Sequence, residues 1–397
     1  MDRSRPAAPP ASAPGAGTQC CPLRDTALDA LPQDRAHGRS ATPRVPRRAT
    51  DVTLTQLRGF LAIVESGHNI TLAAQRLHAT QSGLSKQLAQ LETALGCPLF
   101  ERRARALEGL TDAGRQVLAH ARRLLAEADN IQALTDNLRG ERHGALRIAT
   151  THTQARHALA PGLQALERDW PGVAVHVVPG DDADGVQALV DGHADLALLS
   201  GTGAPPADCI AVPLYRWRRR VVVPAGHALA GLDRPLRLDD LAGHRLVSYA
   251  SSQSPGSSLQ RAFARRGLHA DVAVTARDGD LIQAYTRAGL GVGIVAEMAL
   301  DLREDLVAPA IDEALLPPCT AWLLMPPTRL LRDFGFALLA ALAPQHAPVD
   351  LRRLLADGQP LPTPAPDWST WRAAVHAHTL PLVTTLTGSR RRRPRPG

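Results

Sequence analysis

The spacing of apolar residues changes once along this chain, close to residue 140. From Thr53 to about Gly140 apolar side chains recur three and four positions apart, as they do along one face of a helix. From Ala145 to about Ala343 short apolar runs such as ALRIAT, VAVHVV and GVGIVA alternate with helical stretches. This alternation is typical of an α/β domain whose helices cover a mostly parallel sheet. The sequence therefore predicts a mainly α-helical domain followed by an α/β domain.

Two terminal segments lack this patterning. Residues 1–50 are rich in Pro, Ala, Arg and Gly and carry no apolar periodicity, which predicts a disordered extension. We expect translation to start near Val52, and N-terminal peptide mapping would test this. Residues 357–397 are predicted to form a disordered basic tail that Trp368 and Trp371 dock only weakly.

The net charge of +7 misleads if it is taken as a sign of nucleic-acid binding. Residues 1–50 hold eight Arg against four Asp, and residues 389–397 add five Arg, so residues 51–388 have a net charge of −2. DNA binding must therefore be argued from local surfaces. Lys86 is the single lysine among 45 basic residues, and it lies in the third predicted helix described below.

Several classes of protein are disfavoured by composition. No run approaches 18 apolar residues, so we expect no membrane span, and the first residues lack the apolar core of a secretory signal, which predicts a cytoplasmic protein. The five cysteines are scattered, so they predict neither a disulfide framework nor a metal site. We expect no cofactor.

Three consecutive segments predict a DNA-binding constellation. Residues 54–66 and 70–77 carry apolar faces of two helices, and residues 81–95 form a longer third helix with Thr80 as a plausible N-cap. A helix, a tight turn and a longer helix form the geometry that places the last helix in the major groove of double-stranded DNA.

The predicted contacts to DNA fall on this third helix and on a basic loop after it. Short polar donors and acceptors gather on the exposed helix face, and arginines mark the tip of a strand–tip–strand segment within LFERRARALEGL that resembles a wing. The alternative is a helix-packing module with an incidental basic loop. The candidate residues are Thr80, Gln81, Ser82, Ser85, Lys86, Gln90, Arg102, Arg103 and Arg105.

The segment from Ala73 to Phe100 resembles the LysR-type transcriptional regulators. It follows the family pattern A-A-x-x-L-x-x-[ST]-Q-x-x-[LI]-S-x-x-[IL]-x-x-L-E-x-x-L-G-x-x-L-F, although the family often has Pro where this chain has Ser82. The resemblance covers about residues 53–345. It implies a winged helix-turn-helix at 53–110, a linker helix at 111–140 and an effector-binding domain at 145–345.

The linker helix carries an apolar stripe that includes Val117, Leu124 and Ile131. In the family this helix pairs with its twin, so the resemblance implies a homodimer or a homotetramer, and RNA polymerase is a further candidate partner. The alternative is a helix that packs on its own domain.

A polar turn follows the first strand of the α/β domain. Thr151, Thr153 and Gln154 surround the expected start of a helix, where free backbone N–H groups and hydroxyls favour an anion without a fixed cation. Simple helix capping is the alternative. Asp278 and Asp280 either line a cleft or cap a later helix.

The stretch TTHTQAR is similar to the CysB-like branch of the family, which controls cysteine biosynthesis and sulfur assimilation. In that branch the turn binds sulfate or an acetylserine effector between two α/β subdomains that are joined by two crossovers, as in periplasmic solute-binding proteins of type 2. The resemblance implies effector contacts from Thr151, Thr153, Gln154, Ser200 and Ser254. Ser200 and Ser254 stand where the branch has threonine, and the loop 250–256 departs most from it.

Three other functions remain to be weighed against a regulator of this branch. An enzyme is disfavoured because the chain lacks G-x-S-x-G, H-E-x-x-H and Walker motifs, although His152 could serve as a general base. A solute-binding module without DNA function would need no polar face on the helix at 81–95. A LysR-type regulator with an unrelated effector is the third.

Overall fold

The computed structural model describes residues 52–103, 106–302, 305–312 and 316–379. The predicted extension at 1–50 lies outside the described residues, as does Arg105 in the predicted wing.

Three short helices form the first domain. They are α1 (Leu54–Glu65), α2 (Ile70–Arg76) and α3 (Gln81–Leu95). Thr53 and Gln56 close a capping box on α1, and Thr80 caps α3 by accepting a 3.2 Å hydrogen bond from the Gly83 backbone N–H. The apolar faces meet in one core, which contains Leu57, Phe60, Ile63, Ala73, Ala74, Leu84, Leu88 and Leu91.

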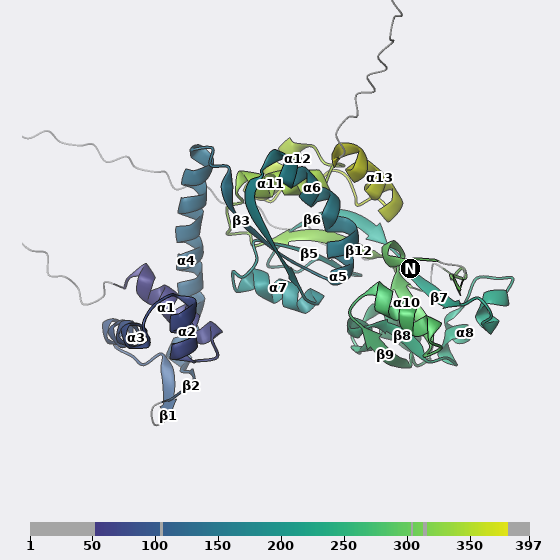
Figure 1. The fold of residues 1–397 in the computed structure, drawn as a ribbon, viewed down its shortest axis with the longest axis horizontal. Helices are drawn as coiled ribbons and strands as arrows, with labels where there is room; N and C mark the ends of the chain where they lie inside the picture. The colour runs from purple at the N-terminus through teal and green to yellow at the C-terminus, as the bar shows by residue number, and fades with distance from the viewer. Residues whose placement is uncertain (1–51, 104–105, 303–304, 313–315, 380–397) are drawn as a thin grey trace, which may run out of the picture. The chain divides into compact units, whose positions relative to one another are not determined.

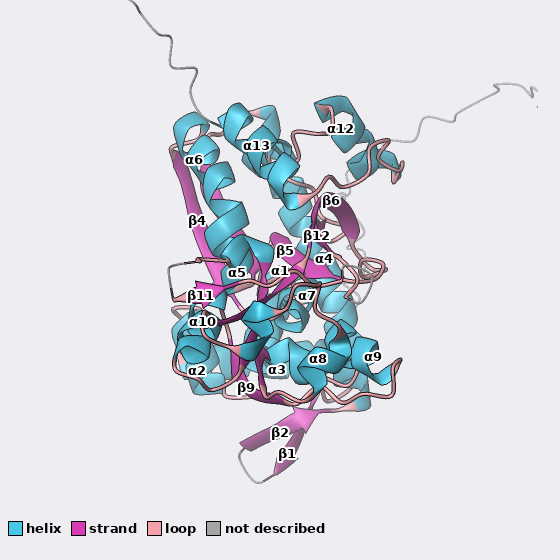
Figure 2. Cartoon of the chain, turned by 90° about the vertical axis from the view of Figure 1, so that its right-hand side faces the viewer, coloured by secondary structure: helices cyan, strands magenta, loops and turns pink. Residues whose placement is uncertain are grey.

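An antiparallel hairpin follows, and Figure 2 shows it projecting from the helices. It consists of β1 (Phe100–Arg103) and β2 (Ala106–Leu110). The long helix α4 (Asp112–Leu138) begins directly after it, with Thr111 as N-cap. The first domain is thus a winged helix-turn-helix with a linker helix, as the sequence predicted.

The α/β region contains two five-stranded sheets, which define two subdomains (Figure 1). The first sheet has the order β4-β3-β5-β12-β6. Its strands are β3 (His143–Thr150), β4 (Gly172–Pro179), β5 (Leu196–Gly201), β6 (Ile210–Trp217) and β12 (Cys319–Met325). Its helices are α5 (His152–Gln154), continued by a π-helical turn (Ala155–Leu159), then α6 (Ala160–Asp169), α7 (Asp182–Val190) and α11 (Asp333–Leu342).

The second sheet has the order β11-β7-β10-β8-β9. Its strands are β7 (Arg219–Pro224), β8 (Leu246–Tyr249), β9 (Val272–Ala276), β10 (Val292–Ala296) and β11 (Leu306–Val307). Helices α8 (Leu238–Ala242), α9 (Ser258–Ala264) and α10 (Gly279–Arg287) belong to this subdomain. The chain passes between the sheets twice, at Arg218 and between β11 and β12, which confirms the predicted two-subdomain architecture.

The expected mostly parallel sheet is a mixed one. Strand β3 pairs in parallel with β4 and β5, whereas β12 runs antiparallel to β5 and β6. The second sheet shows the same mixture, because β7 runs antiparallel to β10 and β11. The strands that flank the two crossovers between the sheets, β6, β7, β11 and β12, are all antiparallel to their neighbours. Strand β6 contains Pro213 within its apolar run, which an edge strand tolerates.

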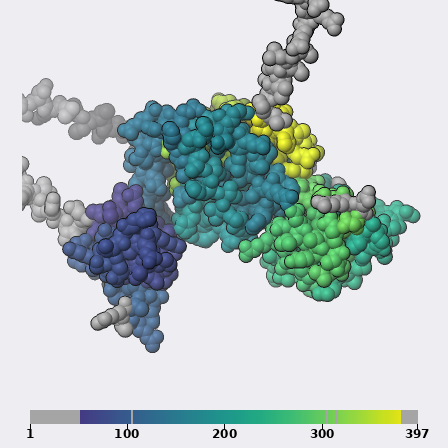
Figure 3. All heavy atoms as spheres, in the orientation of Figure 1, coloured from purple at the N-terminus to yellow at the C-terminus, as the bar shows by residue number. Residues whose placement is uncertain are grey.

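The structure differs from the predicted tail over residues 357–397. Helix α12 (Pro348–Asp357) ends where this segment begins, and helix α13 (Trp368–Thr379) lies within it, against the first subdomain (Figure 3). Trp371 is 1% exposed, stacks on Trp368 and donates a 2.7 Å hydrogen bond from Nε1 to the Leu342 carbonyl oxygen. Large buried rings therefore hold this segment in place, and residues 380–397 lie outside the described range.

None of the described helices combines the length and the hydropathy that a bilayer crossing requires. Within the same residues no group of three or more His, Cys, Asp or Glu side chains could hold a metal ion. The cysteines at 97, 209 and 319 are free thiols.

Candidate functional sites

The exposed face of α3 presents the side chains that the sequence singled out. Leu84, Leu88 and Leu91 turn into the domain core, which leaves the polar residues on the outer side. Gln81, Ser82, Lys86 and Gln90 are exposed, Ser85 is half-buried, and the capping residue Thr80 is exposed at the helix start. Short polar groups with one compact cation suit contacts to base edges and phosphates in a groove.

The two described arginines of the hairpin differ in availability. Arg102 donates a 2.7 Å hydrogen bond from Nη2 to the Glu92 carboxylate, which also accepts from the Leu99 backbone N–H and so fastens the hairpin to α3. The side chain of Arg103 is 84% exposed and lies 3.5 Å from Glu108, a loose surface pair. Arg103 is therefore more available than Arg102 to contact a DNA phosphate.

Helix α4 uses its apolar stripe in two ways. Ala121 and Leu125 are buried against the first domain, as the alternative interpretation of this helix requires. Leu124, Ile131 and Leu138 lie on the helix with 49%, 61% and 78% of their surface exposed. Exposed large apolar side chains repeated along one helix suit a partner helix.

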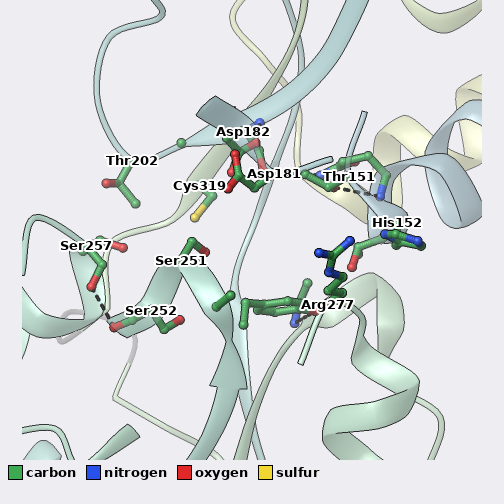
Figure 4. A pocket seen from close by; sticks show the side chains of 18 of the residues that line it. Thr151, His152, Asp181, Asp182, Thr202, Ser251, Ser252, Ser257, Arg277 and Cys319 are labelled. Carbon is green, nitrogen blue, oxygen red and sulfur yellow. Dashed lines mark hydrogen bonds between the residues drawn. The ribbon is translucent and has the colours of Figure 1, made fainter. Parts of the chain in front are cut away.

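A cavity of about 420 Å³ lies where segments of both subdomains meet. Its first wall carries Thr151, Thr153, Gln154 and Ser200 from the first subdomain, and its other wall carries serines from the start of η3 (Ala250–Gln253) to α9 (Figure 4). A cleft with converging polar groups is the usual form of a small-molecule site.

Gln154 is held in one orientation by a buried tyrosine. The Tyr215 hydroxyl donates to Gln154 Oε1, and Gln154 Nε2 lies 3.5 Å from Ser200 Oγ at the cavity wall. Burial raises the pKa of Tyr215 well above its usual range, against the smaller opposing effect of this hydrogen bond, so the hydroxyl stays protonated and donates. The amide therefore directs its N–H₂ donors toward Ser200 and the cavity.

Thr151 and Thr153 have different surroundings. Thr151 caps the turn by accepting from the Gln154 backbone N–H at 3.4 Å, which agrees with the capping alternative, yet it also lines the cavity. Thr153 is 7% exposed, and its side chain opposes the rise that burial causes in the pKa of Tyr249 in the second subdomain. The turn thus contributes hydroxyls both to its own fold and to the cavity.

Ser254 is the exception among the predicted effector residues. It is exposed and does not line the cavity, whereas Ser252 and Ser257 do. The helical turn η3 directs Ser252 inward, where its Oγ lies 2.9 Å from Ser248 Oγ, and Ser257 donates a 3.1 Å hydrogen bond to the Ser252 carbonyl oxygen. The correction arises in the loop 250–256, where the likeness to the CysB-like branch was weakest.

The sequence also missed the charged residues of the cavity. Arg219, Arg261 and Arg277 line it, so the expectation of a site without a fixed cation is wrong, and Asp181 and Asp182 at the start of α7 line it as well. Asp278 instead caps α10, and Asp280 pairs with Arg156. These arginines and aspartates come from four separate segments, which no local sequence pattern connects.

Two donors at the first crossover lack partners within the described part of the chain. Trp217 is 8% exposed and its Nε1 has no hydrogen-bond acceptor. Arg219 donates from Nη2 to Ser258 Oγ at 2.6 Å, but its buried Nη1 has none. Both residues line the cavity, so a ligand there would meet unsatisfied donors.

The protein family follows from two sequence matches. Residues 54–115 match the bacterial regulatory helix-turn-helix protein, lysR family, and residues 139–347 match the LysR substrate binding domain, which is more than half of the chain. The chain is a LysR-type transcriptional regulator. This confirms the family predicted from the motif between Ala73 and Phe100.

Named relatives of this regulator are themselves regulators. It is 38% identical to the HTH-type transcriptional regulator CysB of Haemophilus influenzae over 62% of this chain and 75% of the relative. It is 33% identical to the regulator cbl of Escherichia coli over 72% of this chain and 90% of the relative, and 33% identical to SsuR of Burkholderia cenocepacia over 76% and 98%. Because the chain belongs to this family of transcriptional regulators and carries its helix-turn-helix, the enzyme alternative and the solute-binding alternative are set aside.

A solved structure has the same fold. Full-length OxyR from Pseudomonas aeruginosa, in a variant form, superposes with a TM-score of 0.57 and 22% identity, covering 73% of this regulator and 97% of that chain. The likeness supports the winged helix-turn-helix followed by the two α/β subdomains.

Proposed function

We propose that this regulator controls genes of sulfur and cysteine metabolism in the cytoplasm, binding operator DNA through α3 and responding to a small effector with an anionic group. Membership of the LysR family carries the DNA-binding part, and similarity to CysB, cbl and SsuR supports the sulfur role. The exposed polar face of α3 supports groove contacts from Thr80 to Gln90, with Arg103 at the wing.

The effector binds, in this proposal, at the polar turn. Thr151, Thr153, Gln154 and Ser200 supply hydroxyl and amide donors in one cavity, and the tyrosine behind Gln154 fixes its donors toward the cavity. The ligand touches both subdomains and stabilises the arrangement in which both walls reach it. A ligand with different affinity for two arrangements shifts their populations.

The working unit is a homodimer or a homotetramer. The exposed apolar side chains at 124, 131 and 138 on α4 support pairing with a second copy, and paired domains read two half-sites of an operator. An effector-dependent change in packing would then alter the spacing of the DNA-binding pairs and the contact with RNA polymerase.

The DNA test uses gel mobility shifts of the full chain on promoter fragments near its own locus, at several salt concentrations. Loss of a phosphate or base contact typically costs about 1–3 kcal/mol, so Lys86→Ala and Arg103→Ala should each weaken operator binding roughly 5- to 150-fold. Arg265→Ala removes an exposed charge on the second subdomain and serves as the matched control.

The effector test uses thermal-shift titrations of the same variants with sulfate, thiosulfate, O-acetylserine and N-acetylserine. Lys86→Ala and Arg103→Ala should keep the wild-type response to each compound, because both residues lie in the first domain. Equal loss of ligand and DNA binding in folded protein would contradict this division. DNA footprints that stay identical through a saturating ligand titration would argue against an effector-driven switch.

A further inference from the structure

Helix α13 lies beyond residues 139–347, the part of the chain that matches the LysR substrate binding domain. It nevertheless packs against α6, α11 and β6 of the first subdomain (Figure 1). Its buried side chains Trp368, Trp371 and Val375 belong to the same hydrophobic cluster as Tyr215 on β6. The helix is therefore built into the core behind the polar turn.

Hydrogen bonds fasten this helix at its start, in its middle and at its end. Directly before it, the Pro366 carbonyl oxygen accepts a 2.7 Å hydrogen bond from the Arg216 backbone N–H, so this segment pairs with the outer edge of β6. The Trp371 indole holds the middle, and the Thr379 carbonyl oxygen accepts a 2.9 Å bond from Arg168 Nη1. The position of α13 is thus fixed relative to the strand that carries Tyr215.

The two indoles of α13 confine the Tyr215 ring. Its centroid lies 4.4 Å from that of Trp371 and 5.0 Å from that of Trp368, and the two indoles stack at 5.3 Å. Tyr215 is fully buried, so its ring cannot shift while both indoles stay in place, because protein interiors are close-packed. The Tyr215 hydroxyl donates to Gln154 Oε1, so the indoles also restrain the orientation of that amide.

We infer that α13 is a positioning element of the effector cavity. Trp368 and Trp371 hold the Tyr215 ring, the Tyr215 hydroxyl holds the Gln154 amide, and the amide presents its donors to the ligand. Neither tryptophan lines the cavity, so both act through Tyr215. The inference rests on the proposed effector site and assigns a part in it to a segment outside the matched domain. If α13 only covered the core, its loss would lower stability and leave the polar turn unchanged.

Hydrogen exchange tests this without any ligand. Mass spectrometry on the full chain follows the backbone amides of residues 150–159 in wild type, Trp368→Leu and Trp368→Phe. Trp368→Leu should raise their exchange rate about fivefold or more, because Gln154 loses its restraint and the turn opens locally, and Trp368→Phe, which keeps a ring, should restore most of the protection. Trp170→Leu is the matched control, because Trp170 follows the far end of α6, packs on Phe334 and does not line the cavity.

A double-mutant cycle tests the path through Tyr215. Calorimetry measures the affinity for sulfate, thiosulfate, O-acetylserine and N-acetylserine in wild type, Trp368→Leu, Tyr215→Phe and the double variant. Trp368→Leu should weaken ligand binding about fivefold or more in the wild-type chain and about twofold or less in the Tyr215→Phe chain, because the hydroxyl through which it acts is absent there. A helix that only adds buried surface would produce no such coupling.

The two measurements separate this inference from the proposed function. Unchanged exchange at 150–159 in Trp368→Leu, with faster exchange confined to α13, would overturn the inference, as would equal weakening of ligand binding in the two Tyr215 backgrounds. If none of the four compounds binds the wild-type chain, the proposed effectors are wrong and the exchange measurement alone decides the inference. Operator binding by the same protein shows whether the regulator function stands.

Discussion

Replacing Tyr215 by Phe removes one hydroxyl and leaves the aromatic packing in place. The Tyr215 ring lies 4.4 Å from the Trp371 ring and 5.0 Å from the Trp368 ring, between centroids, so phenylalanine fills the same space. What is lost is the hydrogen bond to Gln154 Oε1, an acceptor on a side chain that is 2% exposed. Leaving a buried acceptor unsatisfied costs about 1–3 kcal/mol of the free energy of unfolding.

The effect should be visible in the unfolding of the effector domain alone. The five tryptophans of the chain are residues 170, 217, 322, 368 and 371, all in that domain, so urea unfolding followed by tryptophan fluorescence reports on it. Tyr215→Phe should lower the free energy of unfolding by this amount. Tyr285→Phe is the control, because the Tyr285 hydroxyl has no hydrogen-bond partner in the described part of the chain.

A double-mutant cycle decides whether Gln154 is the partner that matters. In a Gln154→Ala background the acceptor is gone, so Tyr215→Phe should cost at least about 0.5 kcal/mol less than in the wild-type chain. Tyr215→Phe should also weaken ligand binding in the wild-type chain, because an untethered Gln154 amide can direct Oε1 into the cavity. In the Gln154→Ala background it should weaken ligand binding less. Strictly additive costs, or a cost for Tyr215→Phe equal to that of Tyr285→Phe, would refute the reasoning.

Three further changes test other parts of the fold. Trp371→Ala should destabilise the effector domain by about 3–5 kcal/mol in the same urea assay, because it empties a fully buried ring site. Gly114→Ala places a Cβ 2.0 Å from the Leu99 carbonyl oxygen, so operator binding should be lost at a lower temperature than in the wild-type chain. Burial raises the folded-state pKa of Asp182 from 3.8 to about 6, so the free energy of unfolding falls as pH rises from about 4 to about 6; Asp182→Asn should therefore be more stable than wild type by about 3 kcal/mol at pH 8 and gain nothing below pH 4.

The fold was predictable from the sequence where local pattern and packing agree. The caps at Thr53 and Thr80 and the leucines at 84, 88 and 91 specify α1 and α3 without reference to distant residues. Strand β6 was not predictable in this way, because Pro213 reads as a break and only the pairing with β12 reveals an edge strand. Helix α13 depends in the same way on partners far along the chain, including Tyr215 and Leu342.

The residues of the cavity also divide into those that the local sequence indicates and those that only the fold brings together. Thr151, Thr153 and Gln154 were predictable because they lie together on one turn, and Ser200 because the resemblance to the CysB-like branch implied it. Arg219, Asp182 and Ser252 required the fold, since each lies on a different element and only the topology brings them to one cavity.

The cavity also links ligand recognition to the junction between the subdomains. Trp217 and Arg219 flank the first crossover, and Cys319 begins the strand that follows the second, so the chain passes between the sheets at the cavity itself. A ligand that satisfies Trp217 and Arg219 acts on the segment about which the two subdomains are connected. Contacts with the outer rim alone would leave that segment unaffected. Binding energy placed at such a junction can bias the relative arrangement of two rigid units, which is what a ligand-responsive regulator requires.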